Sequence, residues 1–343
     1  MLALRKTNPA FGLDFAEVPE PPAPGVGEVT LNVDAVGICG SDVHAYEWTA
    51  GYGFMTDRMP VTMGHEFAGT VVAAGRGAGV AEGARVTVTP AIACGACPSC
   101  RRDDTRNCER REALGLTRDG GFARRLTLPA HNCIALPETV DMELGAMSEP
   151  LGVGCEAVLV GEVGLGDTVL VLGPGTIGQG IALMARAAGA GRVLVAGRAD
   201  APRFDVLRNL GFDELIDVAE GPLREQVLAA TGGRPVDVVL EATGHPASIA
   251  DGMGVLRKGG VIVAVGIHPA PVSFNLTDFV RLRHQLRASH GSSRPTFDRV
   301  LALVARDPEA FRPMITHRLP LTRGLEGFEL ARQRAASKVI LRP

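Results

Sequence analysis

Short apolar runs alternate with glycine turns and helix-like stretches through the second half of the chain. The segment DTVLVLGPGTIGQGIALMARAAGAGRVLVAGRAD, residues 167–200, opens with an apolar run at 167–172 that suits a buried parallel strand. A tight glycine turn, a helix and a second strand follow. The alternation continues through ELIDV, PVDVVLEATG and GGVIVAVGI, with helical stretches between them. This pattern predicts an α/β fold with a doubly wound, six-stranded parallel sheet.

The glycine turn carries a nucleotide-binding signature. Gly173, Gly175 and Gly178 form a GxGxxG pattern, which is weak evidence alone in a chain with 43 glycines. Between a predicted strand and a predicted helix it becomes strong evidence. Such a turn presents backbone N–H groups and a helix N-terminus, and both favour a pyrophosphate. The sequence therefore predicts a Rossmann-type dinucleotide-binding domain.

The residues after the second strand of this domain bear on the choice between NAD and NADP. An NAD enzyme usually ends that strand in Asp or Glu, which accepts hydrogen bonds from the ribose hydroxyls. Here Gly197 and Arg198 occupy that position. Asp200 follows three residues after Gly197, and Arg203 comes after it. An arginine beside a missing acid suits a 2′-phosphate, so the sequence slightly favours NADP. A loop shift that brings Asp200 to the ribose would restore NAD, and a solvated loop cation is the alternative role for Arg198.

Composition limits the class of protein. A chain of 343 residues exceeds what one hydrophobic core usually supports, which predicts two domains. Lys plus Arg number 35 against 38 for Asp plus Glu, so no basic footprint indicates nucleic acid or an anionic membrane as a partner. The start, MLALRKTNPAFGLDF, lacks the apolar core of a signal peptide, and no run approaches the ~20 apolar residues of a spanning helix. We therefore expect a cytoplasmic protein, in which stable disulfides are rare.

Four of the seven cysteines lie close together in the segment CGACPSCRRDDTRNC. Their spacing, Cys94-x2-Cys97-x2-Cys100-x7-Cys108, suits a small loop folded around one tetrahedral Zn²⁺. A disulfide or redox cluster and an iron–sulfur centre are the alternatives, although the bacterial iron–sulfur signature ends in Cys-Pro and Glu109 follows here. Four thiolates leave no open position on the metal, so a structural role is expected.

A second group of candidate ligands lies in three separate segments. VGICGSDVHAY contributes Cys39, Ser41, Asp42 and His44, VTMGHEFAGTVVAAG contributes His65 and Glu66, and AMSEPLGVG contributes Glu149. Each of these residues alone is explained by ordinary packing. Two patterns are harder to explain by packing. One is the adjacent His-Glu pair between glycines, and the other is a cysteine followed by a hydroxyl residue two positions later and a histidine five positions later.

These segments resemble the zinc-containing medium-chain alcohol dehydrogenase superfamily, and the resemblance covers essentially the whole chain. GHE-x2-G-x5-G, residues 64–75, matches the zinc signature of that family throughout, and the four-cysteine segment follows about where the family places it. CGSDVH and the glutamate of SEPLGVG are similar to the polyol (sorbitol-like) branch. HAYEW, MPVTMGHEF and PMITHR are similar to the threonine dehydrogenase branch.

The resemblance implies roles for the second group of residues. Cys39, His65 and Glu66 would bind a catalytic zinc, with Glu149 as an exchangeable fourth ligand or a water-mediated neighbour. Asp42 would accept the free N–H of His65 and fix its tautomer. The substrate proton would pass from Ser41 to the cofactor ribose and from His44 to solvent. Cys133 and Cys155 match no ligand position and are expected to be small core residues.

The resemblance also implies the organisation of the chain. A mostly β, GroES-like catalytic domain over 1–151 would carry both zincs, a dinucleotide domain would follow over 152–288, and residues 289–343 would return to the first domain. The active site is expected between the domains. The expected cofactor contacts are Gly173, Gly175, Thr176, Ile177, Gly178, Arg198, Arg203, Thr243, Val265 and Ile267.

The expected activity is zinc-dependent hydride transfer between NAD(P) and a secondary alcohol, a polyol or a sugar-derived alcohol or ketone. L-Threonine 3-dehydrogenase-like oxidation of an amino alcohol is the alternative. A non-enzymatic, zinc-stapled nucleotide-binding protein is a remote alternative, because it would have no use for Cys39, His65 and Glu66. Residues 47–57, EWTAGYGFMTD, are expected to form one wall of the substrate pocket. A homo-oligomer, dimer or tetramer, is expected by the same resemblance.

Overall fold

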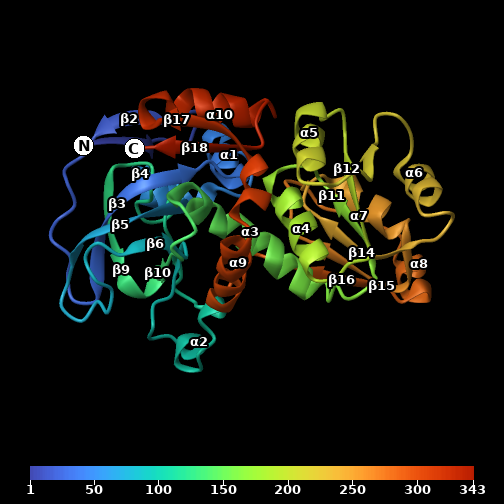
Figure 1. Ribbon diagram of the computed structural model, residues 1–343, viewed down its shortest axis with the longest axis horizontal. Coiled ribbons are helices and arrows are strands. Elements are labelled where there is room, and N and C mark those ends of the chain that lie inside the picture. Colours follow the sequence, from blue (N-terminus) through green and yellow to red (C-terminus); the bar gives the residue numbers. More distant parts are fainter. The chain divides into compact units, whose positions relative to one another are not determined.

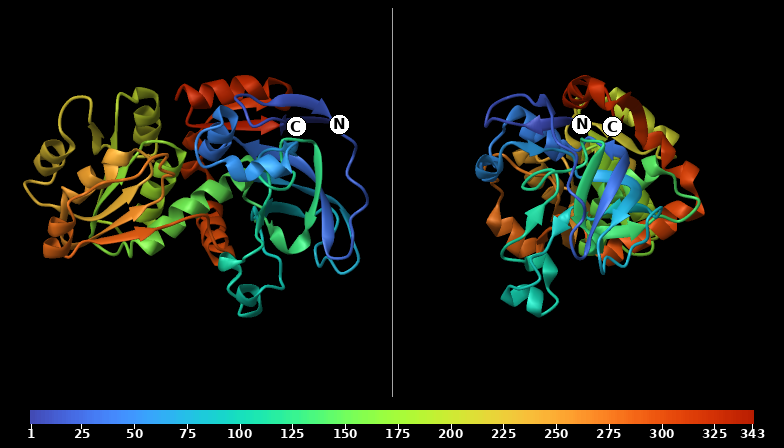
Figure 2. Two further views of the ribbon diagram at one scale, coloured as in Figure 1. Left: turned by 180° about the vertical axis from the view of Figure 1, so that it is seen from behind. Right: turned by 90° about the vertical axis from the view of Figure 1, so that its left-hand side faces the viewer.

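The chain folds into two compact units. The computed structural model describes residues Met1–Pro343, of which Met1–Glu149 and Ser293–Pro343 form unit 1 and Pro150–Ser292 form unit 2. Figures 1 and 2 show the elements of each unit. None of the helices combines the length and apolar character needed to cross a membrane.

Unit 1 is built mainly from β-strands. Its largest sheet has seven strands, with the order β10-β6-β5-β3-β18-β17 and with β9 also paired to β3. A three-stranded sheet, β2-β1-β4, and the pair β7-β8 complete the β-structure. The strands of unit 1 are β1 (Leu2–Lys6), β2 (Asp14–Glu17), β3 (Glu28–Gly37), β4 (Val61–Thr62), β5 (Glu66–Ala74), β6 (Arg85–Val88), β7 (Ala91–Ile92), β8 (Glu112–Ala113), β9 (Arg125–Pro129), β10 (Cys133–Ala135), β17 (Ile315–Pro320) and β18 (Lys338–Arg342).

The helices of unit 1 are short or lie at its margins. They are α1 (Gly40–Glu47), α2 (Pro98–Arg101), α9 (Arg294–Arg306) and α10 (Gly324–Arg332), with the 3₁₀ turns η1 (Gly53–Arg58), η2 (Thr105–Asn107), η3 (Ala130–Asn132), η4 (Pro308–Ala310), η5 (Arg312–Met314) and η6 (Leu321–Arg323). The long helix α3 (Met142–Val160) begins in unit 1 and continues into unit 2.

Strand β3 shows why this sequence forms the central sheet of unit 1. Its residues alternate between apolar and polar side chains from Val29 to Asp34, the period-2 pattern that puts successive side chains on opposite faces of a strand. Val29, Leu31 and Val33 are at most 1% exposed. They belong to the core cluster of this unit together with Phe67.

Unit 2 contains the predicted six-stranded parallel sheet. Its order is β13-β12-β11-β14-β15-β16, all pairs are parallel, and the strand order reverses beside β11. The prediction of a doubly wound sheet is confirmed. Its elements are β11 (Thr168–Leu172), α4 (Thr176–Ala187), β12 (Arg192–Gly197), α5 (Ala201–Asn209), β13 (Leu215–Asp217), α6 (Leu223–Ala230), β14 (Val236–Glu241), α7 (Pro246–Met253), β15 (Leu256–Ala264), α8 (Leu276–Leu282) and β16 (Gln285–Ala288).

The central strands of this sheet are apolar without alternation, because they are covered on both faces. Val169, Leu170 and Val171 of β11 have no exposed surface. In this arrangement ligand sites are expected at the carboxyl ends of the strands, next to the point where the strand order reverses.

Candidate functional site

The pairing of two long strands brings the first three candidate ligands together. In the antiparallel pair β3–β5, Gly37 lies opposite Glu66. Cys39 follows β3 and is the N-cap residue of α1, while His65 directly precedes β5. As a result, ligand atoms of Cys39, His65 and Glu66 all lie within 4.8 Å of one another.

This cluster fits a zinc ion. Zinc–ligand distances of about 2.0–2.3 Å place the ligand atoms of a tetrahedral site about 3.3–3.8 Å apart. A thiolate, an imidazole and a carboxylate are the donors that zinc accepts in proteins. Glu66 has no exposed surface, and its Oε1 has no hydrogen-bond partner. Burying a carboxylate oxygen without a partner costs free energy unless a cation compensates its charge. Both the donor set and this unpartnered oxygen therefore fit a bound zinc ion.

The orientation of His65 leaves one ring nitrogen for a metal. Nδ1 lies 3.3 Å from Oδ1 of Asp42, a side chain with no exposed surface. The other carboxylate oxygen of Asp42 accepts a bond of 3.0 Å from the backbone N–H of Cys39. Nε2 of His65 lies on the side of Ser41, 3.3 Å from its hydroxyl oxygen. Burial acts to lower the pKa of His65, but the charges of Asp42 and Cys39 outweigh it and hold that pKa well above its ordinary value.

A buried lysine that the sequence did not single out completes this cluster. Nζ of Lys338 lies 2.5 Å from Oε2 of Glu66, and both side chains are only 1% exposed. Nζ also donates to the carbonyl of Ile38 at 3.0 Å. Burial acts to lower the pKa of Lys338, but the charges of Glu66 and Cys39 raise it above the ordinary value. The only sequence signal was a lysine at the start of an apolar strand, KVIL, which by itself indicates no site.

Glu149 lies near the cluster without joining it. Its side chain is buried, and the charges of His65 and Glu66 act on it, but its carboxylate is not among the atoms within 4.8 Å. Burial raises the pKa of Glu149 to about 7. The structure thus places this residue as a neighbour of the three ligands.

The two residues predicted to carry the proton, Ser41 and His44, both lie on α1. Ser41 is adjacent to Nε2 of His65, and Nδ1 of His44 lies 3.3 Å from the hydroxyl of Thr49. The ring of Tyr52 stacks on His44 at a centroid distance of 6.0 Å. Tyr52 is buried beside Ser41, and burial raises the pKa of its hydroxyl. The predicted pocket-wall segment 47–57 therefore brings a phenol next to Ser41, which the sequence did not show.

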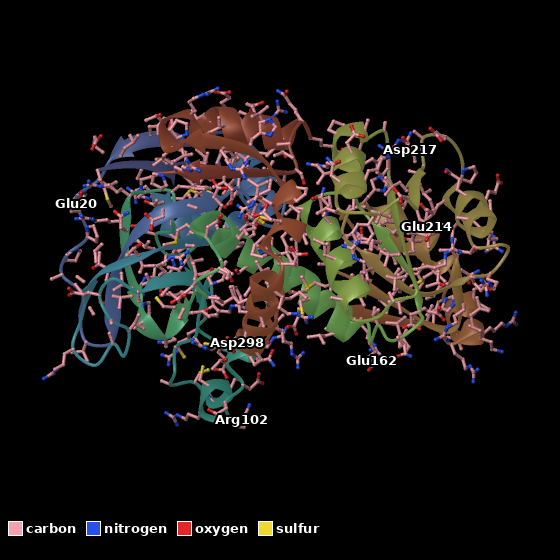
Figure 3. All side chains as sticks on the ribbon, in the orientation of Figure 1. Glu20, Arg102, Glu162, Glu214, Asp217 and Asp298 are labelled. Carbon is pink, nitrogen blue, oxygen red and sulfur yellow. The ribbon has the colours of Figure 1, made fainter.

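The four clustered cysteines form a separate centre. Their sulfur atoms lie within 4.8 Å of one another, with 3.4 Å between those of Cys97 and Cys100, and all four are free thiols. Backbone N–H groups point at the sulfurs, and the bonds from Ala96 and Cys97 lower the pKa of Cys94 to about 6. The geometry suits four thiolates around one zinc. The lobe around α2 stands away from the sheets of unit 1, and Arg102 points outward at its end (Figures 2 and 3).

The glycine turn of unit 2 has the geometry of a dinucleotide site. Gly173 follows β11 with φ +111°, a conformation that favours glycine, and Gly175 is the N-cap residue of α4. A Cβ on Gly178 would lie 1.7 Å from the carbonyl oxygen of Gly173, so only glycine allows the turn and helix to approach. Thr176 and Ile177 are the first residues of α4, and a helix N-terminus is a favourable place for an anion.

The other predicted cofactor contacts lie at the same edge of the sheet. Thr243 follows β14, while Val265 and Ile267 follow β15, and Ile267 is 49% exposed. Glu241 holds the first of these turns, because its Oε1 accepts from the N–H groups of Thr243 at 2.7 Å and Gly244 at 3.0 Å.

One further histidine joins the two turns. Nε2 of His268 lies 3.0 Å from Oε2 of Glu241, so one buried carboxylate bonds to the turn after β14 and to the loop after β15. The sequence does not indicate this pair, since the two residues are 27 positions apart and belong to no motif.

The loop after β12 places the predicted nucleotide determinants differently. Arg198 is exposed. Asp200 is only 4% exposed, and its Oδ2 lies 3.3 Å from the guanidinium of Arg203. The other oxygen, Oδ1, is buried without a hydrogen-bond partner, so Asp200 would have to become exposed to reach a ribose.

Comparison with known proteins identifies the family of both parts of the chain. The profile of the alcohol dehydrogenase GroES-like domain matches residues 25–138, and that of the zinc-binding dehydrogenase domain matches residues 176–306. The chain is 34% identical to the L-threonine 3-dehydrogenase of Pyrococcus abyssi over 99% of this chain and 98% of that protein. It is 32% identical to the sorbitol dehydrogenase of Halalkalibacterium halodurans over 100% of this chain and 99% of that protein.

A solved structure gives the same result for the fold. A protein from Sinorhizobium meliloti 1021, crystallised with NADP bound, superimposes with a TM-score of 0.88 at 29% identity, covering 100% of this chain and 99% of that one. The first unit is thus GroES-like and the second is of the Rossmann type. Together with the identity of about a third along the full length, these matches show that the chain belongs to the zinc-containing medium-chain alcohol dehydrogenase superfamily, close to its threonine and polyol branches.

Proposed function

We propose that this protein oxidises a secondary alcohol, or reduces the corresponding ketone, with one zinc at Cys39, His65 and Glu66 and with NAD(P) on unit 2. The observation that carries the proposal is the convergence of these three ligands within 4.8 Å, on residues that no packing requirement brings together. A zinc held there would supply a Lewis acid that favours loss of a proton from a hydroxyl. The nicotinamide would supply the hydride acceptor.

The side chains around the three ligands have distinct tasks in this proposal. Asp42 holds His65 in the tautomer that leaves Nε2 for the metal, as the 3.3 Å approach to Nδ1 supports. Ser41 receives the substrate proton, because its hydroxyl lies 3.3 Å from that same Nε2. His44 then delivers a proton toward solvent from the next turn of α1. Glu149 acts as an exchangeable or water-mediated neighbour of the metal, which its burial beside the cluster supports.

The second zinc has a structural role in this proposal. Cys94, Cys97, Cys100 and Cys108 would hold it in a closed site, so it would stabilise the lobe and take no part in hydride transfer. Each chain would therefore bind two zinc ions.

For the nucleotide we propose NADP or NAD, with NADP slightly favoured. The exposed Arg198 beside Gly197 supports a contact with a 2′-phosphate. The ion pair between Asp200 and Arg203 opposes the use of Asp200 as the ribose acid. The NADP in the related S. meliloti structure also supports this choice.

The proposed substrate is a polyol or a sugar-derived alcohol or ketone. Glu149 and the CGSDVH segment support the polyol branch, and Tyr52 adds a second hydroxyl beside Ser41 that suits a substrate with neighbouring hydroxyls. L-Threonine is the second candidate, favoured by the 34% identity to a threonine 3-dehydrogenase.

The protein is further proposed to be a cytoplasmic homo-oligomer. The seven cysteines are free thiols, as expected in a reducing compartment. Apolar side chains are exposed at the edge strand of unit 2 and on the helix before it, among them Leu276 at 63% and Val280 at 64%. Such a surface is unusual for a monomer and supports self-association, as a dimer or tetramer.

A combined metal and activity assay tests the proposal. Purified protein should contain two zincs per chain and should turn over at least one member of a panel of polyols, L-threonine and simple secondary alcohols with NAD or NADP. The substrate of that panel with the highest kcat/KM distinguishes the polyol branch from the threonine branch. One zinc per chain and no absorbance change at the nicotinamide wavelength with any alcohol would reject the enzymatic role.

A further inference from the structure

A ribose-binding acid is expected at the end of β12, but this protein has no room for a side chain at that position. Gly197 is the last residue of β12, and a Cβ built on it would lie 2.7 Å from Cγ of Pro174 and 2.9 Å from Cζ of Phe204. The ring of Phe204 and the proline of the glycine turn therefore fill the space that an aspartate or glutamate would need. An acid that binds the ribose hydroxyls therefore has to come from another position, either in the loop after β12 or on a neighbouring strand.

The neighbouring strand ends in such an acid. In the parallel pair β12–β13, Asp217 lies directly opposite Gly197, and adjacent strands are about 4.8 Å apart. Oδ1 of Asp217 accepts from the backbone N–H of Ala199 at 2.9 Å and from that of Ala219 at 2.9 Å. Both bonds use Oδ1, which leaves Oδ2 available to a ligand.

Asp217 also fixes the conformation of the loop that carries Arg198. Ala199 has φ +47°, the left-handed region that a residue with a Cβ rarely adopts, and its N–H points at the carboxylate. The hydrogen bonds from Ala199 and Ala219, together with the charge of Arg198, lower the pKa of Asp217. The carboxylate is therefore ionised at neutral pH and lies close to Arg198.

We propose that Asp217 supplies the carboxylate that binds the adenosine ribose, displaced by one strand from its usual position, and that it opposes Arg198 in the choice between NAD and NADP. This inference rests on the dinucleotide site of the proposed function. Oδ2 accepts a hydrogen bond from the 2′-hydroxyl of NAD, whereas a 2′-phosphate on the same carbon meets a like charge. Arg198 attracts that phosphate, so the two residues act in opposite directions and the wild-type preference stays small.

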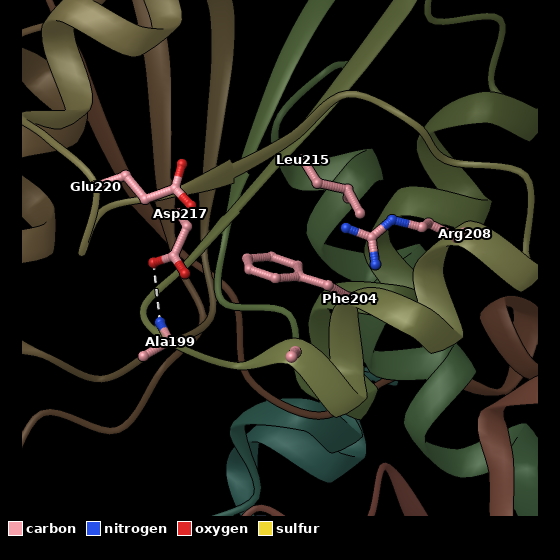
Figure 4. Close-up of a pocket in the computed structure, with 7 residues that line it drawn as sticks. Ala199, Phe204, Arg208, Leu215, Asp217 and Glu220 are labelled. Carbon is pink, nitrogen blue, oxygen red and sulfur yellow. Dashed lines mark hydrogen bonds between the residues drawn. The ribbon is translucent and has the colours of Figure 1, made fainter.

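The surroundings of Asp217 support this assignment. A surface pocket of about 480 Å³ lies beside β13 and α5, and Asp217 is one of its lining residues. Figure 4 shows the carboxylates of Asp217 and Glu220 on one side of it, the ring of Phe204 in the middle and the guanidinium of Arg208 on the other side. Arg208 is already paired with Asp205 at 2.6 Å, so it does not offset the two carboxylates. The pocket is therefore unfavourable for a dianionic phosphate unless Arg198 compensates.

The test compares cofactor preference in four proteins: the wild type, Asp217→Asn, Arg198→Ala and the double variant. Asparagine keeps an oxygen for the N–H groups of Ala199 and Ala219, so the loop should keep its conformation. With the best alcohol of the panel, Asp217→Asn should raise the ratio of kcat/KM for NADP to that for NAD by at least about tenfold, because a charged hydrogen bond to the ribose is lost and a like charge is removed. Arg198→Ala should lower the same ratio by about tenfold, mainly through KM for NADP.

Glu220→Gln is the matched control. It removes one charge from the same pocket without touching the bond to Ala199, so the ratio should change by less than about threefold. A ratio in Asp217→Asn within about twofold of the wild type, or equal shifts in Asp217→Asn and Glu220→Gln, would overturn the assignment. If Asp217→Asn does not fold, as judged by circular dichroism and zinc content, Asp217→Ser replaces it and the same ratio decides.

Binding measurements separate this inference from the proposed function. Dissociation constants for NADH and NADPH, followed by nicotinamide fluorescence, need no turnover. If no alcohol of the panel reacts with the wild type, the proposed function fails while the NADH-to-NADPH ratio of the variants still decides the role of Asp217. If turnover is normal but the ratio does not move, only the role of Asp217 fails.

Discussion

Glu66 is held between a candidate metal position and a buried lysine. One oxygen bonds to Nζ of Lys338 at 2.5 Å, and the other has no partner in the protein. A carboxylate without exposed surface is stable only where positive charge compensates it. The charge balance of the cluster therefore depends on a residue 272 positions away in the sequence.

Replacing Lys338 by methionine should destabilise the protein strongly. Removing one member of a buried ion pair leaves the other charge uncompensated, which typically costs about 3–5 kcal/mol. We expect a loss of this size in the free energy of unfolding of Lys338→Met, measured in urea at equal zinc content. Adding Glu66→Gln should recover more than half of the loss, because the orphaned charge disappears. A single variant within about 1 kcal/mol of the wild type would show that the pair contributes little.

At the residue scale the sequence predicted the candidate ligands and Asp42 beside His65, but it did not reveal the other buried partners. Cys39, His65 and Glu66 could be predicted because their spacing and their neighbouring glycines form a recognisable motif. Lys338, Glu241 and His268 could not, since a buried charge pair depends on which strands become neighbours. Asp217 could not be predicted either, because the register of two strands places it opposite Gly197.

At the scale of elements, strand pairing and turns position the chemistry. The register of β3 and β5 places Cys39 beside His65, and the same sheet brings β18 with Lys338 to β3. Continuous apolar runs between glycine turns predicted the parallel strands of unit 2, because strands buried on both faces are apolar throughout. The short strands of unit 1, such as β4 and β7 with two residues each, have no such signal and form through tertiary pairing.

The four-cysteine lobe gives a prediction for a single element. Its only α-helix, α2, has four residues, so in the proposed function the lobe would depend on a bound zinc for its structure. Cys97→Ser should lower the thermal midpoint of unfolding or disrupt assembly, because removing a ligand from a closed zinc site removes folding energy.

The folded fraction of Cys97→Ser should keep its activity. Turnover per molecule of folded protein, measured after size-exclusion chromatography, is the readout. Cys133→Ser is a suitable control, since Cys133 is buried in the core of unit 1 and lies outside both metal clusters. A well-folded Cys97→Ser protein without turnover would show that this zinc takes part in the reaction.

At the scale of the whole molecule, metal and nucleotide are assigned to different units. Both metal clusters are built from residues of unit 1, and the glycine turn with its neighbouring loops belongs to unit 2. The chain returns to unit 1 at Ser293, and β18 from this last segment supplies Lys338. A change at one metal cluster should therefore leave the other cluster and the nucleotide site intact.

The central claim is that hydride transfer depends on a zinc held by Cys39, His65 and Glu66, and His65→Ala tests it most directly. The metal would act on charge that develops in the transition state, so its loss should reduce turnover more than cofactor affinity. We expect turnover to fall by at least ~10³-fold, about 4 kcal/mol of barrier. The folded variant should retain one zinc per chain in the cysteine lobe and should bind NAD(P)H as the wild type does. Near-normal turnover by a folded His65→Ala protein that contains only one zinc would contradict the account.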